Sequence, residues 1–130
     1  MIKLMLTLVL AVICNNVMAE WNKLVEDDEE SFVVYVDPPT IHKNGNSVKM
    51  WVLSDYKEAQ ELAFLPLYMS IKSQYEFNCK EEQAKELYAS YHAKNMGGGK
   101  VIYSDKIPEN WSPVSPDSLD KELWKFACGQ

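Results

Sequence analysis

Hydrophobic and polar residues alternate with a period of two along much of this chain, a pattern typical of strands that bury one face. Residues 31–36 are β-branched and aromatic, and the alternation places Phe32, Val34 and Val36 on one face. Residues 68–79 alternate in the same way. Each of these two segments is therefore predicted to be a strand with one buried face.

The dipeptide Asn44-Gly45 is the strongest hairpin signal in the sequence, because both residues tolerate the backbone angles of a tight turn. It predicts strands near residues 40–43 and 47–54. In the second of these strands three apolar residues, Val48, Met50 and Val52, alternate with residues 49, 51 and 53.

The connections are predicted from proline, glycine and charge. Residues 57–67 are interpreted as a connection because Pro66 closes them, and the acidic run at residues 26–30 is interpreted as a solvated loop. Three consecutive glycines within residues 96–100 predict a loop that leads into a strand at residues 100–105.

Residues 80–93 support two interpretations. Their composition of Glu, Gln, Ala, Lys and Leu favours a helix. A period of two instead places Leu87, Ala89 and Tyr91 on one face of a strand. The residues alone do not choose between the helix and the strand.

The chain is predicted to end in a helix within residues 112–130. Ser115 is the expected cap, with Pro116 at the first helical position, and Gly129 is the expected terminator. Four residues form one apolar stripe along this helix: Leu119, Leu123, Phe126 and Ala127.

The first residues have the pattern of a secretory signal. An uncharged apolar run at residues 4–13 is too short to span a membrane as a helix and is followed by small residues. We predict a signal peptide at residues 1–19, cleaved between Ala19 and Glu20, and one domain at residues 20–130. No transmembrane segment is predicted after the cleavage point.

Cys14 offers an alternative start, as the anchor of a lipoprotein. The lipoprotein route favours Gly, Ala or Ser before the cysteine, whereas Ile13 is bulky and branched. We therefore expect an exported protein, periplasmic or extracellular, that is soluble rather than lipid-anchored.

The charge of the chain narrows the classes of partner. Its 130 residues have a formal net charge of −6, and every basic residue is lysine. Removal of residues 1–19 takes away one lysine and leaves about −7. An acidic protein without arginine is a poor candidate for binding nucleic acid or anionic lipid headgroups.

Two cysteines remain after the predicted cleavage, Cys79 and Cys128. In an exported chain two cysteines most often form one disulfide. The alternative is a reactive thiol partnered by His42 or His92, which an oxidising compartment disfavours.

The sequence nominates no catalytic, metal or cofactor site. His42 and His92 are its only histidines, and neither has a ligand or nucleophile at a recognisable spacing. Tyrosine and tryptophan are plentiful instead. They could form a binding platform on an exposed sheet face, or fill the core and edges of a sheet, which β-propensity favours.

Six short motifs occur in an order that resembles the bacterial surface-adhesin protein E family: YVDPPTI (35–41), WVLSDY (51–56), YEFNC (75–79), GKVIYSD (99–105), WSPVSP (111–116) and FAC (126–128). The resemblance implies an α+β fold in which an antiparallel sheet of about six strands packs against one C-terminal helix. It also implies a Cys79–Cys128 bridge and a strand, not a helix, at residues 83–93.

The same resemblance implies an exported binding protein and not an enzyme. Its expected partners are host matrix and plasma proteins such as laminin, vitronectin and plasminogen, or an envelope protein, and the family adhesin can form a homodimer. A soluble periplasmic protein of envelope maintenance, or an inhibitor, is the alternative. A small enzyme built around His92, Tyr88 and Tyr91 is a third hypothesis, and no ligand-binding residue is transferred from the family.

Overall fold

A computed structural model of the chain describes residues 20–29, 31–107 and 110–129. The predicted signal peptide at residues 1–19 lies outside these described residues. Among the described residues, no helix is long and apolar enough to cross a membrane.

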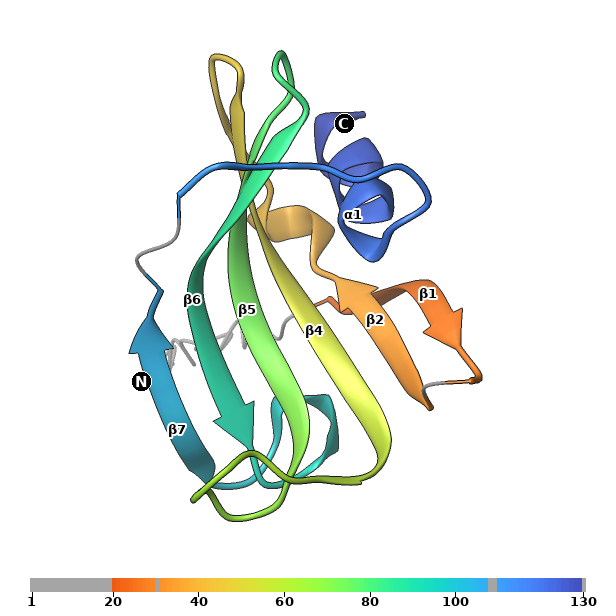
Figure 1. Ribbon diagram of the computed structural model, residues 1–130, viewed down its shortest axis with the longest axis vertical. Helices are drawn as coiled ribbons and strands as arrows, with labels where there is room; N and C mark the ends of the chain where they lie inside the picture. Colours follow the sequence, from red (N-terminus) through yellow and green to blue (C-terminus); the bar gives the residue numbers. More distant parts are fainter. Residues whose placement is uncertain (1–19, 30, 108–109, 130) are drawn as a thin grey trace, which may run out of the picture.

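The fold is α+β, with one antiparallel sheet and one C-terminal helix packed against it (Figure 1). Six strands form the main path of the sheet, in the order β1-β2-β4-β5-β6-β7. Their bounds are Asn22–Asp27 (β1), Phe32–Val36 (β2), Ser47–Gln60 (β4), Tyr68–Asn78 (β5), Gln83–His92 (β6) and Val101–Lys106 (β7).

Two short strands and two 3-10 turns complete the described structure around this path. β3 pairs with β4, and β8 pairs with β6. The bounds are His42–Asn44 (β3), Ser112–Pro113 (β8), Pro38–Thr40 (η1) and Asn95–Gly97 (η2), and the helix α1 spans Leu119–Cys128.

The core lies between α1 and one end of one sheet face. The alternating apolar residues predicted for β2 and β4 do face it, which confirms both strand assignments. Ten buried residues form the core cluster: Val34, Val36, Val48, Met50, Val52, Phe77, Ala84, Val114, Leu123 and Ala127.

Residues 83–92 form strand β6, as the family resemblance implied, although their composition favours a helix. Pairing with β5 on one side and with β7 and β8 on the other outweighs the local propensity. The pairing with β5 shifts register between Gln74 and Tyr75, which leaves Leu87 without a partner on β5.

Two predictions at the edges of strands were wrong. β4 continues to Gln60, so the first part of the predicted connection at residues 57–67 is strand. Glu26 and Asp27 belong to β1 and not to a loop. Both errors concern polar residues near an edge of the sheet, where period-two alternation is weak. Two of these residues, Lys57 and Glu26, form a salt bridge at 3.4 Å.

The cap of α1 is Ser118, three residues after the predicted Ser115. The Ser118 hydroxyl oxygen accepts a hydrogen bond from the backbone N–H of Lys121 at 3.2 Å. The same hydroxyl donates to the Ser115 carbonyl at 2.6 Å, so Ser115 takes part in the turn that precedes the helix. The predicted stripe is confirmed, with Leu123 and Ala127 buried in the core.

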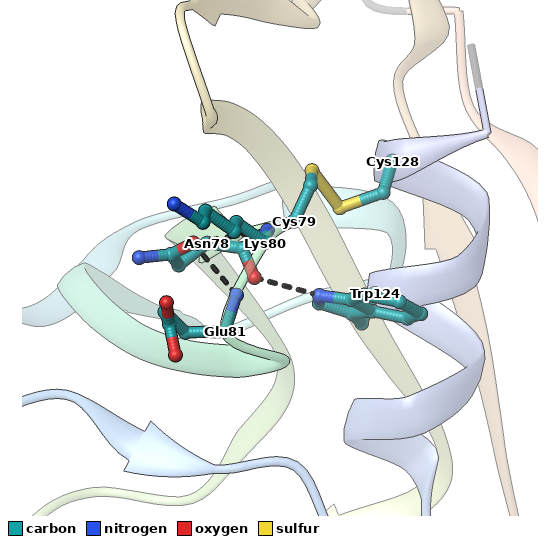
Figure 2. Close-up of a disulfide and its surroundings, with 6 residues drawn as sticks. All are labelled: Asn78, Cys79, Lys80, Glu81, Trp124 and Cys128. Atoms are coloured by element: carbon teal, nitrogen blue, oxygen red, sulfur yellow. Dashed lines mark hydrogen bonds between the residues drawn. A yellow bond between two sulfur atoms is a disulfide. The ribbon is translucent and has the colours of Figure 1, made fainter.

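Two contacts near its C-terminal end fix α1 to the sheet (Figure 2). Cys128 forms a disulfide with Cys79, which directly follows β5. One turn earlier, the indole N–H of Trp124 donates to the Asn78 carbonyl at 2.9 Å. The bridge and the hydrogen bond therefore tie one end of α1 to the same end of β5.

Candidate functional site

The helix covers only one end of its sheet face (Figure 1). An aromatic row crosses the other end of this face. We call Phe32, Tyr56, Tyr68, Tyr91 and Tyr103 the tyrosine row. Successive ring centroids lie 6.0, 6.0, 4.9 and 6.1 Å apart, so each ring contacts the next. The row crosses five strands of the sheet, from β2 to β7.

The exposure of the tyrosine row increases towards the β7 edge. Tyr68 is buried in the middle of the row, whereas Tyr103 is exposed. The Tyr103 hydroxyl donates to Asp105 at 3.1 Å, and this carboxylate raises the pKa of Tyr103. Burial raises the pKa of Tyr68 and Tyr91. These hydroxyls therefore stay protonated at neutral pH and can donate hydrogen bonds.

The opposite face has a groove of about 420 Å³, lined by Trp51, Gln74, Leu87, Tyr88 and Lys106. We call it the Trp51 groove. Trp51 pairs with Gln74, Gln74 with Tyr88 and Tyr88 with Lys106, so four of these residues form one rung across four strands. Leu87 also lines it, at the register shift of β6.

Aromatic rings and ammonium groups lie together in this groove. The Trp51 and Tyr88 rings meet edge to face, with centroids 5.7 Å apart. The ammonium of Lys72 lies 5.1 Å from the centre of the Trp51 ring. The groove can therefore accept an apolar or aromatic group while Lys72 and Lys106 attract a carboxylate.

The same face has a second lysine–tryptophan pair, near the turn between β5 and β6. The Lys85 ammonium lies 4.4 Å from the centre of the Trp111 ring and 3.4 Å from a Glu76 carboxylate oxygen. Glu76 neutralises Lys85, whereas the salt bridges seen in the described structure do not include Lys72 or Lys106. Lys72 and Lys106 therefore bring positive charge to the Trp51 groove.

Comparison with known proteins decides the family. The model of the family named surface-adhesin protein E matches residues 21–129, which is most of the chain. The chain belongs to the surface-adhesin protein E family. No curated protein sequence matches it closely enough to add to this assignment.

Solved structures of Haemophilus influenzae protein E share the fold of this family member. Crystal form II is 13% identical, with a TM-score of 0.64, and the match covers 88% of this chain and 91% of that chain. The protein from non-typeable Haemophilus influenzae is 13% identical, with a TM-score of 0.61 and coverage of 88% and 79%. At this identity the likeness establishes the fold alone.

The two histidines of this family member are not brought together. His42 lines a small cavity of about 210 Å³ beside Lys49 and Glu76, near one end of β5. His92 pairs with Ser70, near the other end of β5. Six residues of strand separate these two rungs, or roughly 20 Å.

The neighbourhood of His92 is a buried structural pair. Its Nε2 lies 2.7 Å from the Ser90 hydroxyl, and both residues are buried. Within the described part of the chain, Nδ1 has no hydrogen-bond partner and no group of three His, Cys, Asp or Glu residues could hold a metal ion. A serine nucleophile would need access to substrate and a group that orients the histidine, and this pair has neither.

The enzyme hypothesis grouped Tyr88 and Tyr91 around His92, but strand β6 places the two tyrosines on opposite faces. Tyr88 lines the Trp51 groove on one face, and Tyr91 belongs to the tyrosine row on the other. The groove itself was missed, because its rung depends on the register of four strands. The available signal was Trp51, a large aromatic residue on the face of β4 opposite Met50 and Val52.

Proposed function

We propose that this family member is an exported binding protein that contacts protein partners through the Trp51 groove. One observation supports the proposal above the others. Trp51, Tyr88 and Lys106 lie on a single rung of the sheet, together with an ammonium group over the Trp51 ring. Tryptophan and tyrosine are the residues that dominate binding energy at protein interfaces.

The partners that fit this surface are proteins with an acidic, partly apolar segment. The groove offers ring faces for an apolar side chain and the ammonium groups of Lys72 and Lys106 for a carboxylate. Host matrix or plasma proteins such as laminin, vitronectin and plasminogen are candidates by family resemblance, as is an envelope protein. The family is one of adhesins, and we propose no catalytic activity for this member.

Binding to immobilised laminin, vitronectin and plasminogen tests this proposal. We expect Trp51→Ala to weaken a micromolar interaction by about tenfold or more, since truncation of a central aromatic commonly costs over 1 kcal/mol. Tyr103→Ala removes an exposed ring from the other face and serves as the matched control. Equal loss in both variants, or no binding of the unmodified chain at micromolar concentration, would contradict the proposed site.

We also propose that residues 1–19 are removed between Ala19 and Glu20, which leaves a chain without a lipid anchor. Ile13 in front of Cys14 supports this cut over the lipoprotein route. It also supports the second candidate function, a soluble periplasmic protein of envelope maintenance or an inhibitor.

Protease treatment of intact cells separates these two functions. Degradation would indicate display outside the cell, as adhesion requires. Protection from the protease, followed by release on osmotic shock, would indicate a periplasmic protein. Mass spectrometry of the same material establishes whether the chain begins at Glu20.

Association into a homodimer is a further part of the proposal, supported by the family resemblance alone. Sedimentation of the exported chain at several concentrations tests it. A single monomeric species up to about 100 μM would contradict a stable dimer.

A further inference from the structure

Large hydrophobic side chains are exposed mainly at one end of this molecule. The loop between β4 and β5, the η2 segment and the start of β7 all lie at the end opposite α1 (Figure 1). We call five exposed residues of these segments the apolar tip: Leu62, Phe64, Leu67, Met96 and Val101. Among the described residues, only one other large hydrophobic side chain is this exposed, Tyr103 on β7.

Phe64 is the most prominent residue of the apolar tip. Its relative exposure is 105%, so none of the residues that the structure describes shields it from solvent. A turn holds it in place, since the Leu65 backbone N–H donates to the Leu62 carbonyl at 2.9 Å. The pairing of Gln60 with Tyr68 closes the loop behind this turn.

Hydrogen bonds also hold the η2 part of the tip against the sheet. Asp55 accepts hydrogen bonds from the Asn95 side chain and the Met96 backbone N–H, both at 2.9 Å. The Gly97 backbone N–H donates to the Ser70 hydroxyl at 2.9 Å. The exposure of Met96 therefore belongs to a fixed turn.

The chemistry of the tip indicates what covers it. Residues 62–67 read Leu-Ala-Phe-Leu-Pro-Leu and contain no polar side chain. The boundary between lipid headgroups and acyl chains accepts apolar side chains below the headgroups and charged side chains at their level. An apolar segment that projects from the end of a hairpin and is flanked by charged residues in the sequence fits this boundary.

Charges next to the tip specify the kind of lipid. Lys94, Lys100, Glu58 and Glu61 are exposed beside it and their charges sum to zero, while the neighbouring Lys57 is paired with Glu26 and Asp28. The chain as a whole carries a net charge of −6, which would be repelled by an anionic surface. We propose that the apolar tip inserts into the interfacial layer of a zwitterionic phospholipid bilayer.

Insertion at this end is compatible with binding on the sheet. The tip lies at one end of the strands (Figure 1), so the molecule would stand end-on. The Trp51 groove lies on a face of the sheet and would remain away from the bilayer. This lipid contact goes beyond the proposed function and does not depend on it.

Flotation of the exported chain with phosphatidylcholine vesicles tests the proposal. We expect the double variant Phe64→Ser/Leu67→Ser to lower the partition coefficient at least tenfold, because two large apolar groups are lost from the inserted loop. Phe64→Trp should retain binding, since tryptophan suits the interface. Tyr103→Ser removes a ring that is also exposed but lies outside the tip, and it should change the partition coefficient less than twofold.

Three results would overturn the proposal. The first is failure of the unmodified chain to float at millimolar phosphatidylcholine, and the second is equal flotation of the double variant. The third is self-association in sedimentation without lipid that the double variant abolishes, which would identify a second copy as the occupant. Trp51→Ala should leave flotation unchanged, so failure of the proposed protein-binding site is distinguishable from failure of the lipid contact. Thermal melting of each variant checks that it is folded.

Discussion

His92 is a buried residue whose two ring nitrogens have different surroundings. Nε2 contacts the Ser90 hydroxyl at 2.7 Å, and that hydroxyl lies 3.5 Å from the Lys72 carbonyl oxygen, to which it can donate. We therefore assign the proton of the neutral ring to Nε2. A second proton would go to Nδ1, which has no acceptor among the described residues. Burial, with a smaller contribution from the positive charge of Lys72, lowers the pKa of His92.

This lowered pKa predicts a loss of stability in mild acid. The unfolded chain binds a proton near pH 6.5, whereas the folded chain binds it only at lower pH. The free energy of unfolding should therefore fall as pH decreases below about 6.5, by at most about 1.4 kcal/mol per pH unit from this one group.

Urea unfolding between pH 7.5 and 5 measures the effect, with His92→Gln as the variant and His42→Gln as the control. His92→Gln is expected to reduce stability at pH 7.5, because it disturbs a buried contact, but to flatten the decline below pH 6.5. His42 is exposed, so its replacement should leave the slope unchanged. Identical slopes in all three chains would show that His92 does not titrate as proposed.

At the scale of single residues, the sequence identified the type of the helix cap but not its position. Ser115 and Ser118 are both competent caps, and Pro116 favoured the earlier one. Asp117 has a positive φ of 56°, which places the turn directly before Ser118. That conformation is uncommon for a residue other than glycine, and the preference for Pro116 at a first helical position did not anticipate it.

At the scale of elements, the disulfide restrains α1 and the sheet together. Cys79 and Cys128 are 49 residues apart in the sequence, so their bridge removes about 4 kcal/mol of chain entropy from the unfolded state. Cys79→Ser and Cys128→Ser are each expected to lower the melting temperature by roughly 10–20 °C. Thermal melting followed by circular dichroism, with and without reductant, measures this.

Reductant provides the control for the disulfide prediction. It should lower the melting temperature of the unmodified chain towards that of the serine variants, and it should leave the variants themselves unchanged. Cys79 and Cys128 both contact the core, so part of the loss in a variant could come from altered packing. If the reductant reduces the disulfide and the unmodified chain still melts at the same temperature, the bridge does not stabilise the fold.

Strands with one buried face were predictable from the sequence. A segment whose conformation depends on pairing with other strands was not. The alternation in β2, β4 and β5 identified these strands because their inward residues form the core. β6 could not be separated from a helix by its residues, since Ala, Glu and Lys suit both, and its partners on each side lie in other segments. β1 was missed because its two apolar residues, Leu24 and Val25, are adjacent and are followed by Glu26 and Asp27, so the segment does not alternate.

At the scale of the whole molecule, the sheet with its helix was predictable and the binding surface was not. The fold follows from local alternation and from a set of motifs that spans the chain. The Trp51 groove requires Trp51, Gln74, Tyr88 and Lys106 to fall on one rung. A register change of one residue in any of these strands would move its side chain to the other face, and single-sequence patterns do not fix register to that accuracy.

The order of the strands predicts how protection from hydrogen exchange should vary across the molecule. β4 and β5 have a strand on each side and contribute buried residues, so their amides should open only with the whole domain. β1 and β7 pair on one side only, and the residues of β7 are almost all exposed. We therefore expect amides of β1 and β7 to exchange at least tenfold faster than those of β4 and β5 in a monomeric sample.

Native exchange followed by mass spectrometry measures this gradient, and its dependence on protein concentration makes it informative about association. A dimer that paired its copies along β7 would slow exchange there as concentration rises, because a second strand would satisfy the edge. Slow exchange in β7 at low micromolar concentration would contradict the prediction for a monomer. Unchanged, fast exchange in β7 at high concentration would place any dimer contact elsewhere, and the apolar tip or the Trp51 groove would be the next surfaces to examine.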